Sequence, residues 1–383
     1  MAVITLLMSI IMPLIFIHDY ESYDYSSGIE VATGGLKGLK NSQNEVKKIA
    51  GDLSISKLNE VLKYLKSFPE DQAYRQGEIK YPGLFNLFKD TYAPLGQETS
   101  FKIGDIENTD DFYDRILLKA KEKKEFLDGK QVSDEEMEFM TYKINRVETP
   151  FRYDFIDQWS ILIKSMIFVY VVIALLAVVI SCNLFSYENE KNMGIVLKTI
   201  GRKKLLTIGL KKIFSAVVYL TILFLVCTLI ISAIVFGTSG ISGWGSQIQI
   251  IPGFLTSLSH WTVGEMYINS IIISLLCITS IALIGSFINV VFQKLYPSLV
   301  VAMLIVVPPM LLYTNATLSA IIRKLLNIQP INGINLLSFI TSLSGYDIGV
   351  CKVLVPTMVC ILAGVTIVLG VYFTPRIFCR WTK

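Results

Sequence analysis

The sequence predicts an all-α integral membrane protein, with six transmembrane helices and a small, mostly helical extracytoplasmic domain between the first two. Its 383 residues are 52% hydrophobic, with a mean hydropathy of +0.54. Only 17% are charged, whereas soluble globular proteins carry about a quarter. Several apolar runs approach the roughly 20 residues that a helix needs to cross a hydrocarbon core. A long polar segment, residues 18–157, separates the first run from the others.

Six apolar segments are long enough, or nearly long enough, to span a membrane. They are Ala2–Ile17, Ser165–Phe185, Ile213–Phe236, Tyr267–Phe292, Ser298–Tyr313 and Val353–Phe373. Backbone groups in lipid must be hydrogen-bonded within their own segment, so each run is expected to be helical. The first run has no basic flank before it and no small-residue cleavage site after it. We therefore interpret residues 1–17 as a retained transmembrane helix, with a cleaved signal peptide as the alternative.

The distribution of charge predicts the orientation of these helices. The connection 186–212 is rich in Lys and Arg, whereas 237–266 contains neither. The positive-inside rule then places the first in the cytoplasm and the second outside. We expect a multi-pass protein of the plasma membrane with both termini cytoplasmic, residues 18–157 outside, and residues 158–383 forming a five-helix domain. The outer connection 314–352 is partly basic and fits this orientation least well.

The polar segment contains three helix patterns. Segment 54–68 has apolar residues at helical spacing behind a capping serine, and 133–144 opens with a Ser-x-x-Glu capping box. Segment 109–127 carries acidic residues early and basic residues late, as the helix dipole favours. Between them, the aromatic stretch 79–96 is predicted to be irregular. It could contact lipid or a ligand, but ordinary loop packing is the interpretation that we favour.

Motifs for catalysis or cofactor binding are missing from the sequence. It contains no GxxxxGK[ST], HExxH or GxSxG, and its only histidines are His18 and His260. The six cysteines lie in or beside the apolar runs without CxxC spacing, so we interpret them as small buried hydrophobic residues. We expect no enzyme activity, resident cofactor, metal or nucleic-acid partner. Charges are nearly absent from the spans, which disfavours an ion-coupled transporter, and Asn183 and Asn289 are interpreted as buried residues that form helix–helix hydrogen bonds.

The connection 186–212, SYENEKNMGIVLKTIGRKKLLTIGLKK, mixes charged and apolar residues. Two acids, Glu188 and Glu190, open it, and seven basic residues follow with leucine and isoleucine between them. We expect the preceding helix to continue beyond Glu188, two glycines to permit turns, and a short amphipathic helix over 202–212 to lead into the next span. Such a helix could lie on anionic lipid headgroups or dock into a groove on a soluble partner.

This connection resembles the one after the second span in ABC transporter permeases of the type-2 exporter class. The shared pattern is an acid, a glycine, Leu-x-Thr, Gly-Arg and then a lysine. The matching residues here are Glu188, Glu190, Gly194, Leu197, Thr199, Gly201, Arg202 and Lys212. The order of a first span, an outer domain and five further spans is also similar. Residues 314–352 suit the amphipathic outer hairpin found before the last span in that class.

The resemblance implies a permease subunit of an ATP-driven exporter for a peptide, lipid, drug or similar substrate. Segment 186–212 would be the coupling segment that docks on a separate ATP-binding cassette subunit, which would bind ATP and Mg. A second permease subunit, identical or different, would pair with this one among the membrane lipids. The residues implied in coupling are Glu188, Glu190, Gly194, Thr199, Gly201, Arg202, Lys203 and Lys204.

Other interpretations stay open. An FtsX-like mechanotransmission permease also has an outer domain after its first span but usually only four spans, so a cytoplasmic turn at 293–297 would distinguish the two. A non-transporting membrane sensor or scaffold would copurify without an ATPase. The sequence also departs from the exporter class because no basic amphipathic helix precedes Ala2–Ile17. Either the start lies upstream or that helix is missing.

Overall fold

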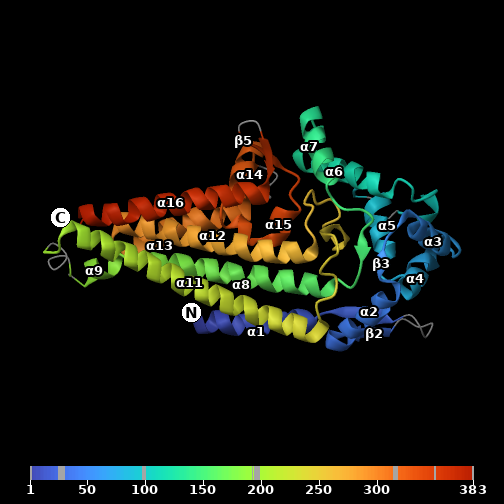
Figure 1. Cartoon of the computed structure of the whole chain (residues 1–383), viewed down its shortest axis with the longest axis horizontal. Coiled ribbons are helices and arrows are strands. Elements are labelled where there is room, and N and C mark those ends of the chain that lie inside the picture. The colour runs from blue at the N-terminus through green and yellow to red at the C-terminus, as the bar shows by residue number, and fades with distance from the viewer. Residues whose placement is uncertain are drawn as a thin grey trace.

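The computed structural model describes residues 2–24, 31–96, 101–191, 193, 199–313, 318–348 and 351–381. It is mostly helical, with a long helical bundle at one end and a smaller domain of short helices at the other (Figure 1). Five helices are long and apolar enough to cross a membrane: α8 (Asp157–Ser181), α11 (Arg202–Ser239), α12 (Val263–Phe292), α13 (Leu295–Leu312) and α16 (Val355–Trp381). These helices support a multi-pass, all-α membrane protein.

A sixth apolar helix, α1 (Ala2–His18), packs against α8 and α11. At 17 residues it is shorter than the other five, and a helix of that length extends over about 25 Å. It lies along the bundle beside α11 and runs toward the domain of short helices (Figure 1). Its outward face is apolar, because Val3, Leu7 and Leu14 are all exposed.

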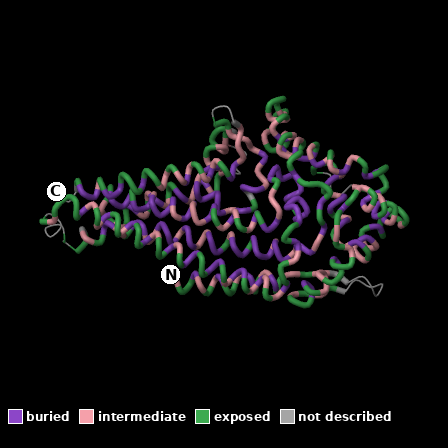
Figure 2. Tube along the Cα trace, viewed as in Figure 1, coloured by how far each residue is buried: buried purple, intermediate pink, exposed green. Residues whose placement is uncertain are grey.

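The centre of the bundle is formed by α8 and α12, which are the most buried of its helices (Figure 2). Their contact depends on small residues, since a Cβ added at Gly285 of α12 would collide with the side chain of Ser181 on α8. Small residues are typical of helix contacts in membranes because they let the backbones approach closely. By contrast, only 22% of the apolar stretch of α13 and 28% of that of α16 is buried, and both helices expose large apolar side chains such as Leu304 and Val368, as expected of helices that face lipid.

The smaller domain, which we call the polar domain, follows α1. Its elements are β1 (Glu21–Asp24), β2 (Val31–Gly34), α2 (Gly35–Ile49), β3 (Gly51–Asp52), α3 (Ile55–Lys66), α4 (Glu70–Lys80), α5 (Leu84–Tyr92), η1 (Ile103–Asp105), α6 (Phe112–Asp128), α7 (Asp134–Ile144) and β4 (Arg152–Tyr153). Strands β1 and β2 form an antiparallel pair, and so do β3 and β4. The second pair joins residues about a hundred positions apart and closes the domain, with Gly51 opposite Tyr153.

The three predicted helices of this domain are confirmed as α3, α6 and α7. The hydroxyl of Ser54 accepts a hydrogen bond from Lys57 N at 3.3 Å, and that of Ser133 accepts one from Glu136 N at 3.3 Å. The prediction that 79–96 is irregular was wrong, because α5 lies within it. That helix buries one face, formed by residues at i, i+3, i+4 and i+7 from Leu84, a spacing that sequence reasoning passed over.

The polar domain and the bundle share one continuous hydrophobic core. At their junction, Arg152 N donates to the Gln247 side chain at 2.8 Å, and Gly243 N donates to the Asp154 carboxylate at 3.0 Å. The buried indole of Trp159 donates to Ser242 O at 2.8 Å and packs edge-on against Tyr267. The connection from α11 to α12, which includes η2 (Ile248–Ile250), is therefore part of the folded junction.

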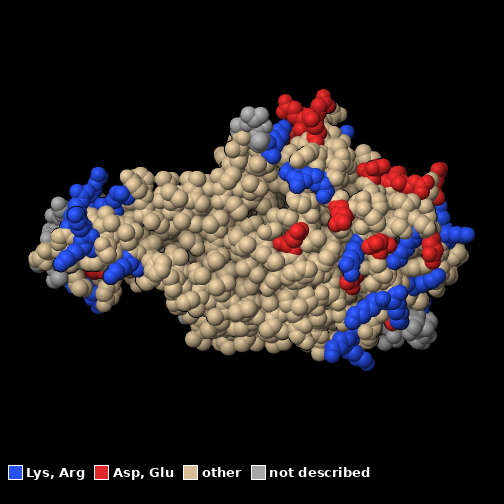
Figure 3. Space-filling model, viewed as in Figure 1, with Lys and Arg blue, Asp and Glu red and all other residues tan. Residues whose placement is uncertain are grey.

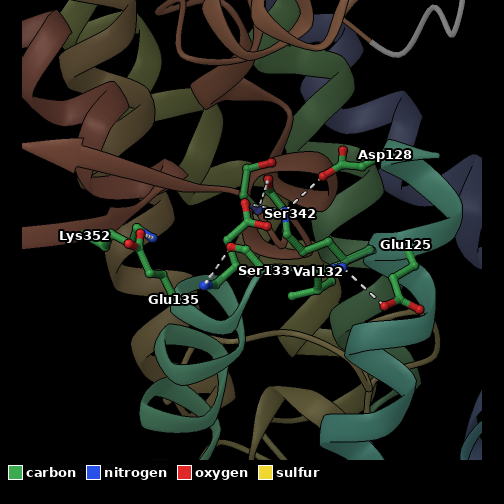
Figure 4. A network of polar contacts seen from close by, with 10 residues as sticks. Glu125, Asp128, Val132, Ser133, Glu135, Ser342 and Lys352 are labelled. Carbon is green, nitrogen blue, oxygen red and sulfur yellow. Dashed lines mark hydrogen bonds and ion pairs between the residues drawn. The ribbon is translucent and has the colours of Figure 1, made fainter. Parts of the chain in front are cut away.

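The segment before α16 is folded against the polar domain. It contains α14 (Ala320–Asn327), η3 (Asn332–Ile334), α15 (Leu336–Ile340) and the antiparallel pair β5 (Gly345–Ile348) and β6 (Cys351–Leu354). Figure 4 shows this contact, in which the Lys352 ammonium lies 3.3 Å from the Glu135 carboxylate of α7. The amphipathic character predicted for 314–352 is present in α14, whereas the β-hairpin was not predicted.

Candidate functional site

Basic side chains gather at the end of the bundle farthest from the polar domain (Figure 3). We call this region the basic end; it comprises α9 (Ser186–Glu190), the first turns of α11, the turn between α12 and α13, and the end of α16. Its exposed basic residues are Lys191, Arg202, Lys203, Lys204, Lys211, Lys294, Arg376 and Arg380. The sequence of these segments contains only two carboxylates, Glu188 and Glu190. Between this end and the polar domain the visible surface of the bundle is almost free of charge (Figure 3).

Glu188 and Lys212 form an ion pair that connects α9 to α11. Their side chains are only 14% and 21% exposed. The Lys212 ammonium also donates to Leu184 O at 2.6 Å and lies 5.4 Å from the centre of the Phe185 ring. A shielded charge is tolerated when it is paired and hydrogen-bonded. Glu188 is therefore a structural carboxylate that holds the connection against the bundle.

Asn289 of α12 determines where α8 ends. Its side-chain oxygen accepts hydrogen bonds from Phe185 N at 2.7 Å and Ser186 N at 3.1 Å, and its amide donates to Ser298 at 3.2 Å. The helix–helix role predicted for Asn289 is confirmed, whereas the same prediction for Asn183 was wrong, because that residue lies exposed in the turn after α8. Our expectation that this helix continues beyond Glu188 was correct only in part: the span that begins at Asp157 reaches Glu188, but a turn over 182–185 divides it into α8, which ends at Ser181, and α9. The two backbone donors that would have continued the helix are instead bonded to α12.

Glu190 connects α9 to a third helix. Its carboxylate accepts a hydrogen bond from Leu295 N, the first residue of α13, at 3.3 Å. A carboxylate at a helix N-terminus is favoured because it satisfies an otherwise free N–H and complements the helix dipole. The turn between α12 and α13 therefore lies beside α9.

The basic residues that precede the third apolar run belong to α11 itself. Gly201 is extended at the N-cap position, and α11 then continues without interruption from Arg202 to Ser239. The helix predicted over 202–212 is confirmed, but it is not a short element of its own: it is continuous with the span that follows, because this stretch contains strong helix formers and no proline. Its one glycine, Gly209, lies against α16, where an added Cβ would approach Pro375 to 3.3 Å.

The first turn of α11 has a basic face and an apolar face. The side chains of Arg202, Lys203 and Lys204 are exposed, whereas Leu205 is buried. Leu205 belongs to a small second core with six other residues. These are Phe185, Ile213, Leu283, Val290, Phe378 and Cys379. Cations on this turn are thus held on a helix that packs against α1, α8, α12 and α16 of the bundle.

The structure brings most of the predicted coupling residues to one end of the bundle. Glu188 is shielded with its partner, Glu190 is exposed but bonded to the start of α13, and the three cations after Gly201 face outward. Thr199 is exposed in the short described stretch that leads into α11. Gly194 and Leu197 lie outside the described residues.

Sequence reasoning missed the contribution of the chain's last helix to this site. Phe378 packs against Phe185 with ring centres 5.0 Å apart, and the Cys379 thiol donates to Arg202 O at 3.8 Å. The apolar Phe378-Cys379 pair within the basic C-terminal tail was the sequence feature that could have indicated this packing. Among the residues that the structure describes, no group of three or more His, Cys, Asp or Glu could hold a metal.

No protein-family model, curated protein or solved structure matches this chain. Its function must therefore be argued from the fold and from the geometry of the basic end.

Proposed function

We propose that this chain is the membrane-spanning permease subunit of an ATP-driven exporter and that the basic end is the docking site for a separate ATP-binding subunit. The observation that carries the proposal is the way α9 and the start of α11 are joined to the bundle. Glu188 connects α9 to α11 through an ion pair. Glu190 connects α9 to α13, and Asn289 of α12 binds the preceding turn, both through hydrogen bonds. Because these contacts reach several spans at once, a force applied at the basic end would be transmitted along the helices.

The orientation that accompanies this proposal follows the charge distribution. The basic end would be cytoplasmic, the polar domain would be outside, and α1 would be the sixth transmembrane helix. Exposed cations at one end and a nearly uncharged surface along the bundle support this arrangement (Figure 3). ATP and Mg would bind to the partner, which is consistent with the missing GxxxxGK[ST] motif.

Two such permease subunits would pair through lipid-facing helices and enclose the substrate path between them. The exposed apolar faces of α11, α13 and α16 are available for this contact or for lipid. The proposed cargo is a peptide, lipid, drug or similar molecule, because the spans present apolar surfaces and almost no charge.

The FtsX-like mechanotransmission permease is the second candidate. The position of the α12–α13 turn favours the six-span exporter over it. Glu190 contacts Leu295, so this turn lies at the same end as α9, as six spans require.

A single cysteine at Tyr296, which is 78% exposed, tests this point directly. Protection of that cysteine from an impermeant thiol reagent added outside intact cells is expected, whereas rapid labelling would contradict the six-span arrangement. Of the five native cysteines that the structure describes, four are buried and Cys360 is partly buried. The wild-type chain is therefore the control for background labelling.

The docking proposal is tested by purifying the tagged chain in mild detergent and identifying stoichiometric partners by mass spectrometry. A partner that carries GxxxxGK[ST] is the expected result. An intact, folded chain that consistently retains no such partner would contradict the exporter proposal and favour a non-transporting sensor or scaffold.

A further inference from the structure

A second charged region lies at the opposite end of the molecule, where α6 of the polar domain meets α14. A cavity of about 330 Å³ separates these helices, within the range of about 300–1,000 Å³ typical of small-molecule sites. It is lined by Lys123, Lys124, Leu127, Asp128, Tyr313, Arg323, Lys324, Asn327 and the turn Thr341–Ser344. The lining therefore contains four basic side chains and one carboxylate.

The single carboxylate is already neutralised. Asp128 lies 3.0 Å from the Lys124 ammonium, which is 4% exposed and also faces Glu136 at 3.5 Å. Asp128 and the turn residue Ser342 lie close together in Figure 4. The positive charge that faces the cavity is therefore supplied by the three other basic residues.

Those three cations, Lys123, Arg323 and Lys324, form no ion pair within 4 Å of any carboxylate in the described part of the chain. All three side chains are partly shielded from solvent. Burial lowers the pKa of Lys123, and the more distant charge of Asp90 offsets only part of this effect. Lys123 donates to the Thr256 hydroxyl at 3.2 Å, and one terminal nitrogen of Arg323 donates to Leu127 O at 3.3 Å. The Nε of Arg323 is buried without any hydrogen-bond partner. Shielded cations and an unsatisfied guanidinium donor are unfavourable unless an anion supplies the missing interactions.

The chemistry of the lining matches a phosphate group. A guanidinium binds phosphate oxygens with two parallel hydrogen bonds, and lysines contribute point charges. The serines of the lining, Ser342 and Ser344, carry hydroxyl groups that can donate, whereas the Thr341 hydroxyl already donates to Leu337 O at 2.7 Å. These groups come from two separate parts of the chain, so an anion in the cavity would bridge the polar domain to the segment that leads into α16.

The position of α14 indicates where such a phosphate would come from. The helix follows the end of α13 and exposes Ile321 and Leu325, while Arg323 and Lys324 face the cavity. A helix with one apolar and one cationic face is typical of the membrane interface. In the proposed orientation, the cavity opens at the level of the outer-leaflet headgroups.

We propose that this cavity binds a phosphate group, carried by an anionic phospholipid of the outer leaflet or free in solution. The site depends on the cavity and its cations and not on the exporter function, so either proposal can fail without the other. The probes are phosphatidylglycerol and inorganic phosphate, each titrated into delipidated full-length protein in a neutral detergent. Bound molecules are counted by native mass spectrometry.

The test variant is Arg323→Gln/Lys324→Gln. The matched control is Lys121→Gln/Lys130→Gln, which also removes two positive charges, at positions in and just after α6 that do not line the cavity. Loss of charge-assisted hydrogen bonds should weaken phosphate binding by at least about tenfold in the test variant and leave the control unchanged. If the test variant does not fold, Lys123→Gln removes a cation from the opposite wall and is expected to give a similar loss.

The outcomes separate the two sources of phosphate. Retention of phosphatidylglycerol that excess inorganic phosphate does not displace supports a lipid headgroup, whereas saturable binding of inorganic phosphate alone supports a free anion. Binding of neither probe would overturn the proposal. Equal affinity in wild-type protein, test variant and control would also overturn it, because the binding would then be general attraction to a basic surface.

Discussion

The two ends of the molecule carry their charges in different ways. In the polar domain many basic side chains have a carboxylate nearby, such as Arg115 with Asp111 at 2.6 Å and Lys48 with Glu45 at 2.6 Å. Among the described residues of the basic end the one ion pair, Glu188 with Lys212, is shielded, and the exposed surface carries many cations and a single carboxylate, Glu190. A mixed surface is what solubility requires. A surface of mostly one sign favours an oppositely charged partner or membrane, because binding relieves the repulsion between neighbouring like charges.

The difference also separates structural residues from binding residues. At the basic end, the inward-facing groups fix the path of the chain, and the outward-facing cations are left for contact. Substitutions of the two kinds should therefore have different effects. Changes to inward-facing groups should alter stability, whereas changes to outward-facing cations should alter partner binding with stability preserved.

The largest effect on stability is expected from Glu188→Gln, which leaves the Lys212 ammonium without its counter-ion. Breaking a fully buried ion pair costs about 3–5 kcal/mol. Since these side chains are 14% and 21% exposed, we expect about 2–3 kcal/mol. Unfolding in detergent, followed by tryptophan fluorescence, measures the change.

A double variant sharpens this test. Adding Lys212→Met to Glu188→Gln removes both charges, so the combined loss should be clearly smaller than the sum of the two single losses. Additive losses would show that the two residues do not act as a pair.

A smaller loss, about 2 kcal/mol, is expected from Asn289→Leu, because two backbone N–H groups then lose their acceptor inside the bundle. The matched control is Asn183→Leu, which changes the same residue type at an exposed position close to the same turn and should cost less than about 0.5 kcal/mol. The same unfolding assay applies. Equal losses in the two variants would contradict the role given to Asn289.

The polar domain provides a pH-dependent contrast. Burial, with a smaller contribution from the charge of Asp157, raises the pKa of Glu78 to about 7. The folded state therefore retains a proton that the unfolded state releases near pH 4.5. Stability from this group is fully present below that pH and is lost as pH rises through about 7. We expect a decrease of about 1–2 kcal/mol across this window.

Glu78→Gln is the matched variant for this effect, because its amide has no ionisable proton. The decrease between pH 4.5 and 7 should be reduced in the variant relative to wild type. A pH profile that is identical in the two proteins would show that Glu78 titrates normally.

Features encoded by local sequence were predictable. The apolar runs predicted the five long helices because membrane-spanning helices need only their own residues to satisfy the backbone. Capping serines predicted the starts of α3 and α7, because each cap bonds to the backbone of its own helix and needs no distant residue. The strands were missed, since β3 and β4 are two residues each and pair across the whole polar domain.

The geometry of the candidate site was less predictable, because it depends on contacts between distant segments. The end of α8 is determined by Asn289, which lies 104 positions after Phe185. The sequence singled out Glu188 and Glu190 by their position but did not indicate that each would bind a different helix. Nor did the sequence show that the last helix packs beside the start of α11.

The most direct test of the central claim is retention of an ATP-binding partner by charge-reversal variants. Lys203→Glu/Lys204→Glu changes two exposed cations at the basic end, and Lys63→Glu/Lys66→Glu changes two exposed cations on α3 of the polar domain. Both variants and wild type are purified identically, and the partner is quantified by mass spectrometry together with ATPase activity. We predict that only the first variant loses the partner while its unfolding temperature stays at the wild-type value. Full retention of the partner and its activity in that variant would contradict docking at the basic end.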